Sequence, residues 1–427
     1  MDTKRILTLC LIVLADMAGA MAIIPIIPVY VLGQFHATPF QAALAIATYY
    51  VAQVLAAPWL GSLSDRFGRR PILLISQAGT IVSYLLLVFA VPLGVLLDHA
   101  GLRFGIAGGL VVIYLARVLD GLTGGNISVA QAYASDISTP EKRTHALGLV
   151  GGASGLGHIL GPALAGLLAG VNLLAPFLAA SVVSGVTVLL TLLWLQEPPI
   201  RTTRSDKEAP QADGLPLSHV LLSRPVMLIL TTALVVGLYM AALSGTFALY
   251  ADRVLLPGQP ESMVVSTVGW IITALGLVMA LTQIVLLNPL VNHLGEQKAI
   301  LLGSFLLAIS AVGFFTVTSL WAVVGFVAVF SLGYGIVWPT LQALITGAGP
   351  DQMAGRLLGW FQATFSLALI LGPILGGFVF DAVAPRAVYG ASAGLMVLAL
   401  VLSIGMQRLP LARTDQQRKV ARMHFHH

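Results

Sequence analysis

The fold is decided by residues 61–71, which read GSLSDRFGRRP between two long apolar segments. Four ionised side chains within six residues cannot lie in hydrocarbon, so this turn is expected at a membrane surface. Its arginines outnumber its single aspartate, and short cytoplasmic loops collect Lys and Arg, so the turn is predicted to face the cytoplasm. Gly61 and Gly68 permit a tight turn or a close helix contact.

The composition independently indicates a membrane protein. The chain of 427 residues is 58% hydrophobic and only 9% charged, whereas a soluble domain has about 25% charged residues. The only cysteine is Cys10, in the first apolar run, so no intrachain disulfide and no cysteine metal cluster is expected. The net charge of +5 is interpreted as membrane topology and contact with lipid headgroups, and no nucleic-acid partner is predicted.

Apolar runs of about 20 residues or more recur along the chain, each long enough to cross a bilayer core as a helix. The predicted spans are residues 6–33, 41–62, 72–94, 107–136, 145–170, 174–196, 225–251, 263–289, 299–318, 321–347, 356–381 and 388–407. Most of the 22 Lys and Arg residues then lie on the side of the N-terminus, which places both termini in the cytoplasm. The first run is too long for a signal peptide and contains Asp16, so it is predicted to remain as a helix.

A long polar interval divides the spans into two sets of six. Residues 197–224 have the composition of a flexible cytoplasmic linker between bundles at 1–196 and 225–407, and a basic cytoplasmic tail follows at 408–427. The two halves also echo each other at one constant offset. Matching pairs are Gln131-Ala132 with Gln342-Ala343, Gly148 with Gly359, Leu160-Gly161-Pro162 with Leu371-Gly372-Pro373, and Gly166 with Gly377.

Residues 61–70 resemble the signature loop of the major facilitator superfamily, G-x-L-[AS]-D-R-x-G-[RK]-[RK], at every specified position. This resemblance implies an all-α integral membrane fold of twelve helices in two parallel six-helix repeats. Substrate would be held between the halves near mid-membrane, and transport would proceed by alternating access. It also implies that Asp65, Arg69 and Asp136, with Gly61 and Gly68, form a gate that closes the cytoplasmic side in the outward-facing state.

The fifth span carries a second pattern. Gly148, Gly157, Gly161, Pro162 and Gly166 resemble the superfamily's antiporter motif, G-x8-G-x3-G-P-x2-G-G, with Ala165 replacing one glycine. The resemblance implies a hinge in this helix and favours proton-coupled export over uptake. A face of small residues that merely packs against another helix is the structural alternative.

Ionisable groups within the spans point to proton coupling. Asp16 lies in the first span, and Arg117 and Asp120 lie in the fourth, about 60° apart on one helical face. Desolvation and a nearby arginine have opposite effects on how tightly a carboxyl group holds its proton, so Asp16 and Asp120 are candidates to bind and release protons. The alternatives are a static Arg117–Asp120 pair and an Asp16 that is solvated without a coupling role.

Among superfamily members, the first 170 residues or so are most similar to bacterial tetracycline–cation/proton antiporters. The similarity rests on Asp16 with its following prolines, residues 53–61, the signature loop and the fourth and fifth spans. Those exporters carry an acidic residue before a Tyr-Leu-Leu-Leu sequence in helix 3, where this chain has Ser83. Exchange of metal-chelated tetracycline is therefore not expected, and Asp120 is a candidate to replace the missing acid.

Aromatic and amide side chains in the spans are candidates for a cavity that suits drug-sized amphipathic solutes. They are Tyr50, Gln53, Gln131, Tyr239, Trp270, Gln283, Trp338, Gln342, Trp360 and Gln362. A hydrophobic cation or a neutral amphipath is preferred, with an anion held by Arg117 as the rival. The alternative function is an uptake symporter or facilitator for a metabolite or an organic anion.

The sequence contains no phosphate-binding loop, no metal-ligand cluster and no nucleophile motif, so it does not support an enzyme or an ATP-driven pump. The sequence therefore predicts a monomeric transporter in the bacterial inner membrane. It would use no cofactor and would be driven by the proton gradient.

Overall fold

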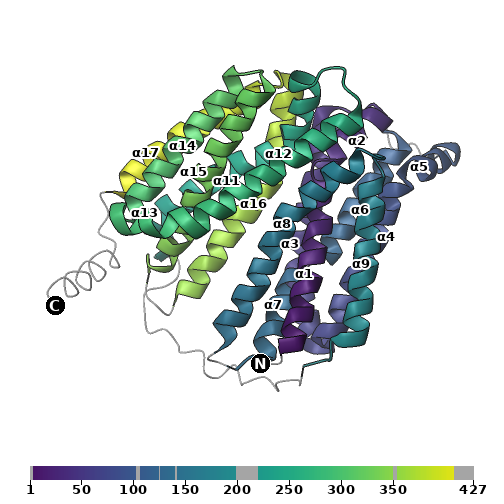
Figure 1. The fold of residues 1–427 in the computed structure, drawn as a ribbon, viewed down its shortest axis with the longest axis horizontal. Coiled ribbons are helices and arrows are strands. Elements are labelled where there is room, and N and C mark those ends of the chain that lie inside the picture. The colour runs from purple at the N-terminus through teal and green to yellow at the C-terminus, as the bar shows by residue number, and fades with distance from the viewer. Residues whose placement is uncertain are drawn as a thin grey trace. The chain divides into compact units, whose positions relative to one another are not determined.

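The computed structural model describes residues 3–101, 106–124, 126–139, 142–198, 220–349 and 353–407. Within these ranges, twelve helices are long and apolar enough to cross a membrane, as the sequence predicts (Figure 1). The predicted tail at 408–427 and most of the predicted linker, residues 199–219, lie outside the described residues.

The helices of the first half follow in chain order. They are α1 (Thr3–Ile23), α2 (Ile27–Phe35), α3 (Pro39–Phe67), α4 (Arg69–Val88), α5 (Ala90–His99), α6 (Gly108–Thr123), α7 (Asn126–Asp136), α8 (Arg143–Ala169) and α9 (Ala175–Trp194). Those of the second half are α11 (Arg224–Tyr250), the π-helix η3 (Ala251–Leu255), α12 (Glu261–Leu281), the π-helix η4 (Thr282–Leu286), α13 (Leu287–Leu294), α14 (Glu296–Thr316), α15 (Leu320–Thr346), α16 (Ala354–Ala382) and α17 (Ala387–Met406).

Two predicted spans are broken at prolines. The first divides into α1 and α2 at a turn over residues 24–26, where Pro25 and Pro28 remove backbone donors and crowd the carbonyls four residues earlier. The third ends as α4 at Val88, and α5 restarts beyond Phe89. Pro92 explains that break, because its ring would clash with the Val88 carbonyl in a continuous helix.

The fourth span is also discontinuous. Helix α6 ends at Thr123 and α7 begins at Asn126, so the predicted span 107–136 is not one continuous helix. Gly124 at the break leaves a carbonyl outside the helical ladder, and the Gln53 side chain of α3 donates to it across 3.2 Å. A side chain from a neighbouring helix thus satisfies backbone that the break has freed, as membrane-embedded breaks require.

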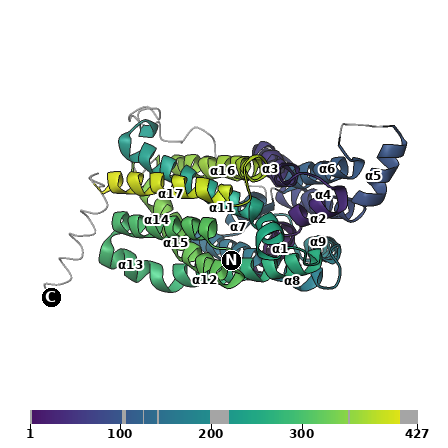
Figure 2. The ribbon, with the colours of Figure 1, turned by 90° about the horizontal axis from the view of Figure 1, so that it is seen from above.

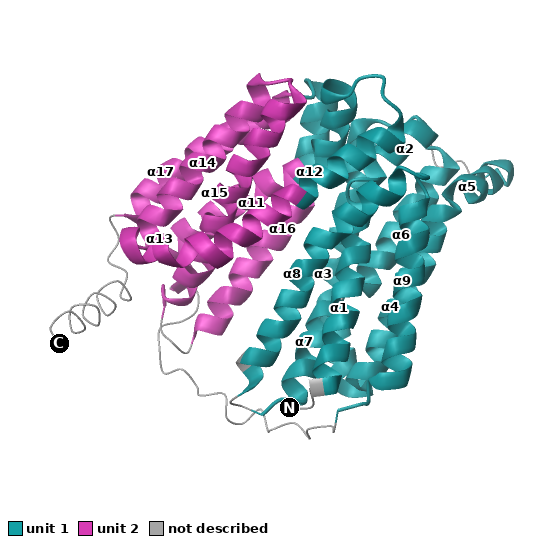
Figure 3. Ribbon diagram, in the orientation of Figure 1, with its two compact units in different colours: residues 1–204, 244–273, 373–385 teal, residues 205–243, 274–372, 386–427 magenta. Residues whose placement is uncertain are grey.

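The chain divides into two compact units (Figure 3). Unit 1 comprises Met1–Arg204, Ser244–Thr273 and Pro373–Pro385, and unit 2 comprises Ser205–Leu243, Ala274–Gly372 and Arg386–His427. Two short segments of the second half therefore group with the helices of the first. The bundle boundaries drawn from the sequence stay a prediction.

Within unit 1, α1 packs against α8 and α9, and α4 packs against α6 and α9 (Figure 1). The short helix α5 lies beside α6, as the view from above shows (Figure 2). Within unit 2, α14 packs against α15 and α17. Each functional side chain described below is carried by one of the helices or by the chain at a helix end.

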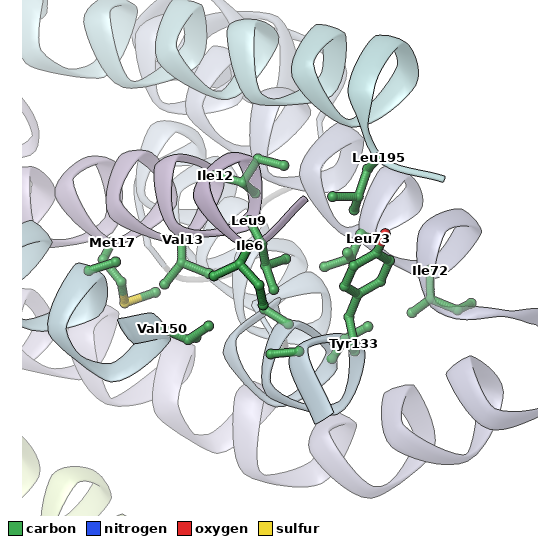
Figure 4. Packing of buried hydrophobic residues seen from close by; sticks show 14 of the residues in the cluster. Ile6, Leu9, Ile12, Val13, Met17, Ile72, Leu73, Tyr133, Val150 and Leu195 are labelled. Carbon is green, nitrogen blue, oxygen red and sulfur yellow. The ribbon is translucent and has the colours of Figure 1, made fainter. Parts of the chain in front are cut away.

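A hydrophobic cluster surrounds the N-terminal half of α1 (Figure 4). Ile6, Leu9 and Val13 recur at helical spacing on one buried face of α1. Tyr133 of α7 and Leu195, just beyond the end of α9, are buried in the same cluster. The chain that leaves α9 is therefore anchored in a hydrophobic core.

Candidate functional site

Arg117 and Asp120 form a buried ion pair on α6. Arg117 Nη2 lies 2.8 Å from Asp120 Oδ2, and the two side chains are only 5% and 4% exposed. The three-residue spacing places both groups on one face of the helix, as the sequence predicts. An isolated charge at this depth would be costly, so each group makes burial of the other tolerable.

Two neighbouring helices complete the surroundings of this pair. The Tyr49 ring of α3 lies 5.6 Å from the Arg117 guanidinium carbon, within the range of a cation–π contact. From α4, Ser83 Oγ lies 3.4 Å from Arg117 Nη2 and donates to the Ala116 carbonyl, while Thr80 hydrogen-bonds Asp120. Ser83 therefore faces the same arginine that Asp120 neutralises.

A small cavity of about 20 Å³ adjoins the pair. Its walls are mainly apolar, with Ile24, Ile27 and Ile46 among them, and Tyr49, Tyr50, Arg117 and Asp120 supply the polar groups. A space of this size holds about one water molecule and no drug-sized solute. Both Arg117 Nε and Asp120 Oδ2 lack a hydrogen bond of good geometry with the protein, so a water in this cavity would have polar partners.

Asp16 lies in a different environment. It is buried in α1, with 6% of its surface exposed, and accepts a hydrogen bond of 3.2 Å from Thr187 of α9. It does not line the cavity beside Asp120. The two carboxylates proposed for proton coupling therefore differ in their access to water, because Asp120 lines the water-sized cavity and Asp16 does not.

The signature loop forms a charge cluster at the junction of α3 and α4. Arg69 Nη1 lies 2.5 Å from Asp65 Oδ1, and Arg69 Nε donates to Asp136 Oδ2 of α7 across 2.9 Å. Ser64 Oγ accepts a further bond of 2.6 Å from Arg69 Nη1. Asp65 is 67% exposed whereas Asp136 is 26% exposed, so the bond to Asp136 is the better shielded of the two.

The glycines of the antiporter motif do not share one environment. A Cβ on Gly157 would lie 2.5 Å from the Met17 Cβ, and one on Gly161 would lie 2.5 Å from the Ala18 carbonyl oxygen, so both glycines let α8 press against α1. Gly166 meets α12, where a Cβ would lie 2.9 Å from the Ser266 carbonyl oxygen. Gly148 has open space around it. Pro162 lies inside α8, which runs unbroken past it.

An aromatic column runs through unit 2. Phe330, Tyr334 and Trp338 of α15 stack in sequence, with ring centroids 5.8 and 5.6 Å apart. Phe361 and Phe365 of α16 lie 4.7 and 4.5 Å from Trp338. Of the predicted substrate contacts, Trp338 is thus packed among rings on several sides.

The remaining substrate candidates are dispersed. Tyr239 is fully buried and its hydroxyl shares a hydrogen bond of 3.0 Å with Ser310, while Gln53 is engaged with Tyr49 and Gly124. Tyr50 lines the cavity beside Asp120. Gln342 is half-buried, and the exposed candidates are Gln131, Trp270, Gln283, Trp360 and Gln362. In the described part of the chain, no group of three or more His, Cys, Asp or Glu side chains is placed to hold a metal ion.

A family model described as Major Facilitator Superfamily matches residues 9–257 and 254–424. The chain belongs to the major facilitator superfamily. It is an integral membrane transporter rather than an enzyme, and the predicted all-α fold of twelve helices in two six-helix repeats is confirmed.

Resistance proteins are among its relatives. The chain is 30% identical over 377 residues to the tetracycline resistance protein, class C, of Escherichia coli, covering 86% of this chain and 87% of that protein. It is 27% identical to multidrug resistance protein 2 of Bacillus subtilis (strain 168), covering 85% of each. The crystal structure of a point mutant of the nucleoside transporter NupG superposes with a TM-score of 0.73 at 11% identity, covering 94% of this chain and 99% of that one, which supports the fold alone.

Several residues of the candidate site were not predicted from the sequence. Tyr49, Thr80 and Thr187 contact the predicted charges but were not candidates. Two of the three positions contained a usable signal: Tyr49 lies four residues before Gln53, and Thr80 lies three before Ser83, so each pair shares a helical face. Glu197, placed at the start of the predicted linker, also contacts the signature loop.

Proposed function

We propose that this transporter is a proton-coupled antiporter that exports small amphipathic molecules by alternating access. The observation that carries the proposal is the buried Arg117–Asp120 pair beside a water-sized cavity. Ionisable groups in the membrane interior are costly, and those that persist commonly serve ion or proton pathways. Asp120 can take up a proton delivered by one water, and uptake would free Arg117 from its partner.

Export is supported by the antiporter-type pattern in α8 and by the tetracycline and multidrug resistance proteins among the relatives. Protons entering down their gradient would drive solute out of the cytoplasm, across the inner membrane and without a cofactor. The predicted cytoplasmic termini and functional monomer belong to the same proposal.

Transport by the purified protein in proteoliposomes tests this function directly. With an imposed pH gradient, a diverse panel of amphipathic solutes should include at least one that accumulates in the more acidic compartment, opposite to the proton flux. Accumulation in the direction of the proton flux would indicate symport. Movement that only equalises the solute concentration, whatever the gradient, would indicate a facilitator.

The charge cluster of Asp65, Arg69 and Asp136 is proposed as the cytoplasmic gate. Two-state transport requires contacts that favour one state, and a partly shielded charged hydrogen bond can contribute about 1–2 kcal/mol to such a bias. An exposed pair contributes under about 1 kcal/mol.

This gate predicts an order of effects. Arg69→Ala should depopulate the cytoplasm-closed state most, Asp136→Asn should follow, and Asp65→Asn should have the smallest effect because Asp65 is the most exposed. Distances between spin labels at His145→Cys and Arg356→Cys, in a Cys10→Ser background, would report the two states. Identical distance distributions in the wild type and Arg69→Ala would contradict the gate.

A further inference from the structure

We propose that Glu197 is a positioning residue of the cytoplasmic gate: its carboxylate binds the backbone of the signature loop and thereby fixes where Arg69 presents its guanidinium. The inference rests on the proposed gate and extends it to the segment that leads out of α9 into the linker.

The contact is a two-pronged hydrogen bond. Arg69 N donates to Glu197 Oε1 across 2.6 Å, and Arg70 N donates to Oε2 across 2.9 Å. Both amides belong to the first turn of α4, where backbone N–H groups have no partner within the helix. A carboxylate here satisfies two of them at once and faces the positive end of the helix dipole.

The loop is shaped to admit this carboxylate. Gly68 has a φ of +97°, a conformation that residues with a Cβ rarely adopt. A Cβ at this position would also lie 2.7 Å from the Glu197 carboxyl carbon. The signature glycine is therefore required twice, once by the backbone turn and once by the close approach of Glu197.

The segment that carries Glu197 is itself fixed. Leu195 is 1% exposed in the hydrophobic cluster around α1, and the Tyr133 hydroxyl of α7 donates to the Gln196 carbonyl across 2.6 Å. The Arg70 guanidinium donates to the Thr191 and Leu192 carbonyls at the end of α9, across 3.3 and 2.7 Å. These contacts fix the chain after α9 and so hold Glu197 beside the signature loop.

These contacts converge on Arg69. Helix α7 holds Gln196 through Tyr133 and also carries Asp136, which accepts from Arg69 Nε. Glu197 holds the Arg69 backbone while Asp65 and Asp136 hold its side chain. Backbone and side chain are fixed from different elements, so loss of Glu197 should displace the guanidinium even though both of its acidic partners remain.

The test uses the full-length transporter with the spin-label pair His145→Cys and Arg356→Cys in the Cys10→Ser background. Glu197→Gln keeps the side-chain size but turns one acceptor into a donor that opposes a backbone N–H. We expect it to lower the ratio of cytoplasm-closed to cytoplasm-open molecules about tenfold, the effect of losing one charge-assisted hydrogen bond. Substrate affinity at equilibrium should change less than transport rate. Leu193→Ala, at an exposed position in the last turn of α9, is the control and should leave the ratio unchanged; Gln196 is unsuitable because its side chain accepts a hydrogen bond from the Arg5 guanidinium.

A double variant separates this inference from the gate itself. If Glu197 acts through Arg69, then Glu197→Ala should cause no further shift in an Arg69→Ala background. Additive shifts, or a Glu197→Gln protein with the wild-type ratio, would overturn the positioning role. A shift caused by Glu197→Ala but not by Arg69→Ala would instead show that the proposed gate is wrong. Thermal unfolding of each variant identifies any that merely folds poorly, and Glu197→Asp then provides a second, milder test with the charge retained.

Discussion

Replacing Asp120 with asparagine is expected to abolish pH-driven transport while leaving substrate counterflow intact at saturating substrate. Asparagine has nearly the same shape but cannot exchange a proton, so the alternating cycle can continue only without coupling. The two assays run on the same proteoliposomes: solute accumulation under a pH gradient, and exchange of labelled for unlabelled solute without one. Driven accumulation should fall to the level of liposomes without protein.

The buried partner of Asp120 calls for a specific control. Removing one member of a buried ion pair leaves the other uncompensated and typically destabilises a protein by about 3–5 kcal/mol. The double variant Arg117→Gln/Asp120→Asn removes both charges. If the lone arginine caused the defect, the double variant should recover driven transport; if the carboxylate carries the proton, it should not.

Asp16→Asn provides the matched comparison, because Asp16 is also a buried carboxylate but does not line the cavity. We expect it to retain more driven transport than Asp120→Asn. Loss of driven transport in Asp16→Asn alone would move the proton site to α1. Full driven transport in both variants would exclude both carboxylates.

Because Ser83 faces Arg117, the carboxylate can be moved from position 120 to position 83 as a test. Ser83 Oγ lies 3.4 Å from Arg117 Nη2, so Ser83→Asp would present a carboxylate to the same guanidinium from α4. In the Asp120→Asn background, Ser83→Asp should restore part of the driven transport. Ser83→Asn, equal in size but unable to exchange a proton in this way, should not.

Most of the fold could be predicted from the sequence because the bilayer imposes strict lengths on apolar helices. The breaks in the first, third and fourth spans were harder to predict, since hydropathy does not register the loss of a helical turn. Pro25, Pro28 and Pro92 nevertheless mark two of the three. At the third, near Gly124, the freed carbonyl accepts a hydrogen bond from Gln53, a contact between helices that hydropathy cannot show.

The charged members of the site were predictable in the same way, because ionisable residues within apolar runs are rare. Arg117 and Asp120 were paired from helical spacing alone. The spacing of Tyr49 to Gln53 gave a weaker signal, and the contact of Thr187 gave none, since a single hydroxyl residue in a membrane helix is common. Glu197 begins the long polar interval whose composition predicts a linker, and only the folded chain brings its carboxylate to the start of α4.

The charge of the substrate should decide which variant loses binding. Ligands could be compared as matched cationic and anionic derivatives of one aromatic compound. A hydrophobic cation would rely on Asp120 and on the Tyr50 ring, so Asp120→Asn should weaken it by about 2 kcal/mol, roughly thirtyfold. An anion would rely on Arg117, and Arg117→Gln should abolish its binding. A neutral amphipath should respond weakly to both.

We expect the cationic or neutral pattern, because Arg117 is already held by Asp120 at 2.8 Å and by the Tyr49 ring. An anion would have to displace the internal carboxylate from Arg117, whereas a cation would compete with a proton for Asp120 once that carboxylate separates from Arg117. The cavity walls are otherwise apolar and would have to open for any drug-sized ligand, which favours solutes with a large apolar surface. Equilibrium binding of both ligands to the wild type, Asp120→Asn and Arg117→Gln distinguishes the three patterns. Tighter cation binding by Asp120→Asn, or anion binding that Arg117→Gln abolishes, would contradict this expectation.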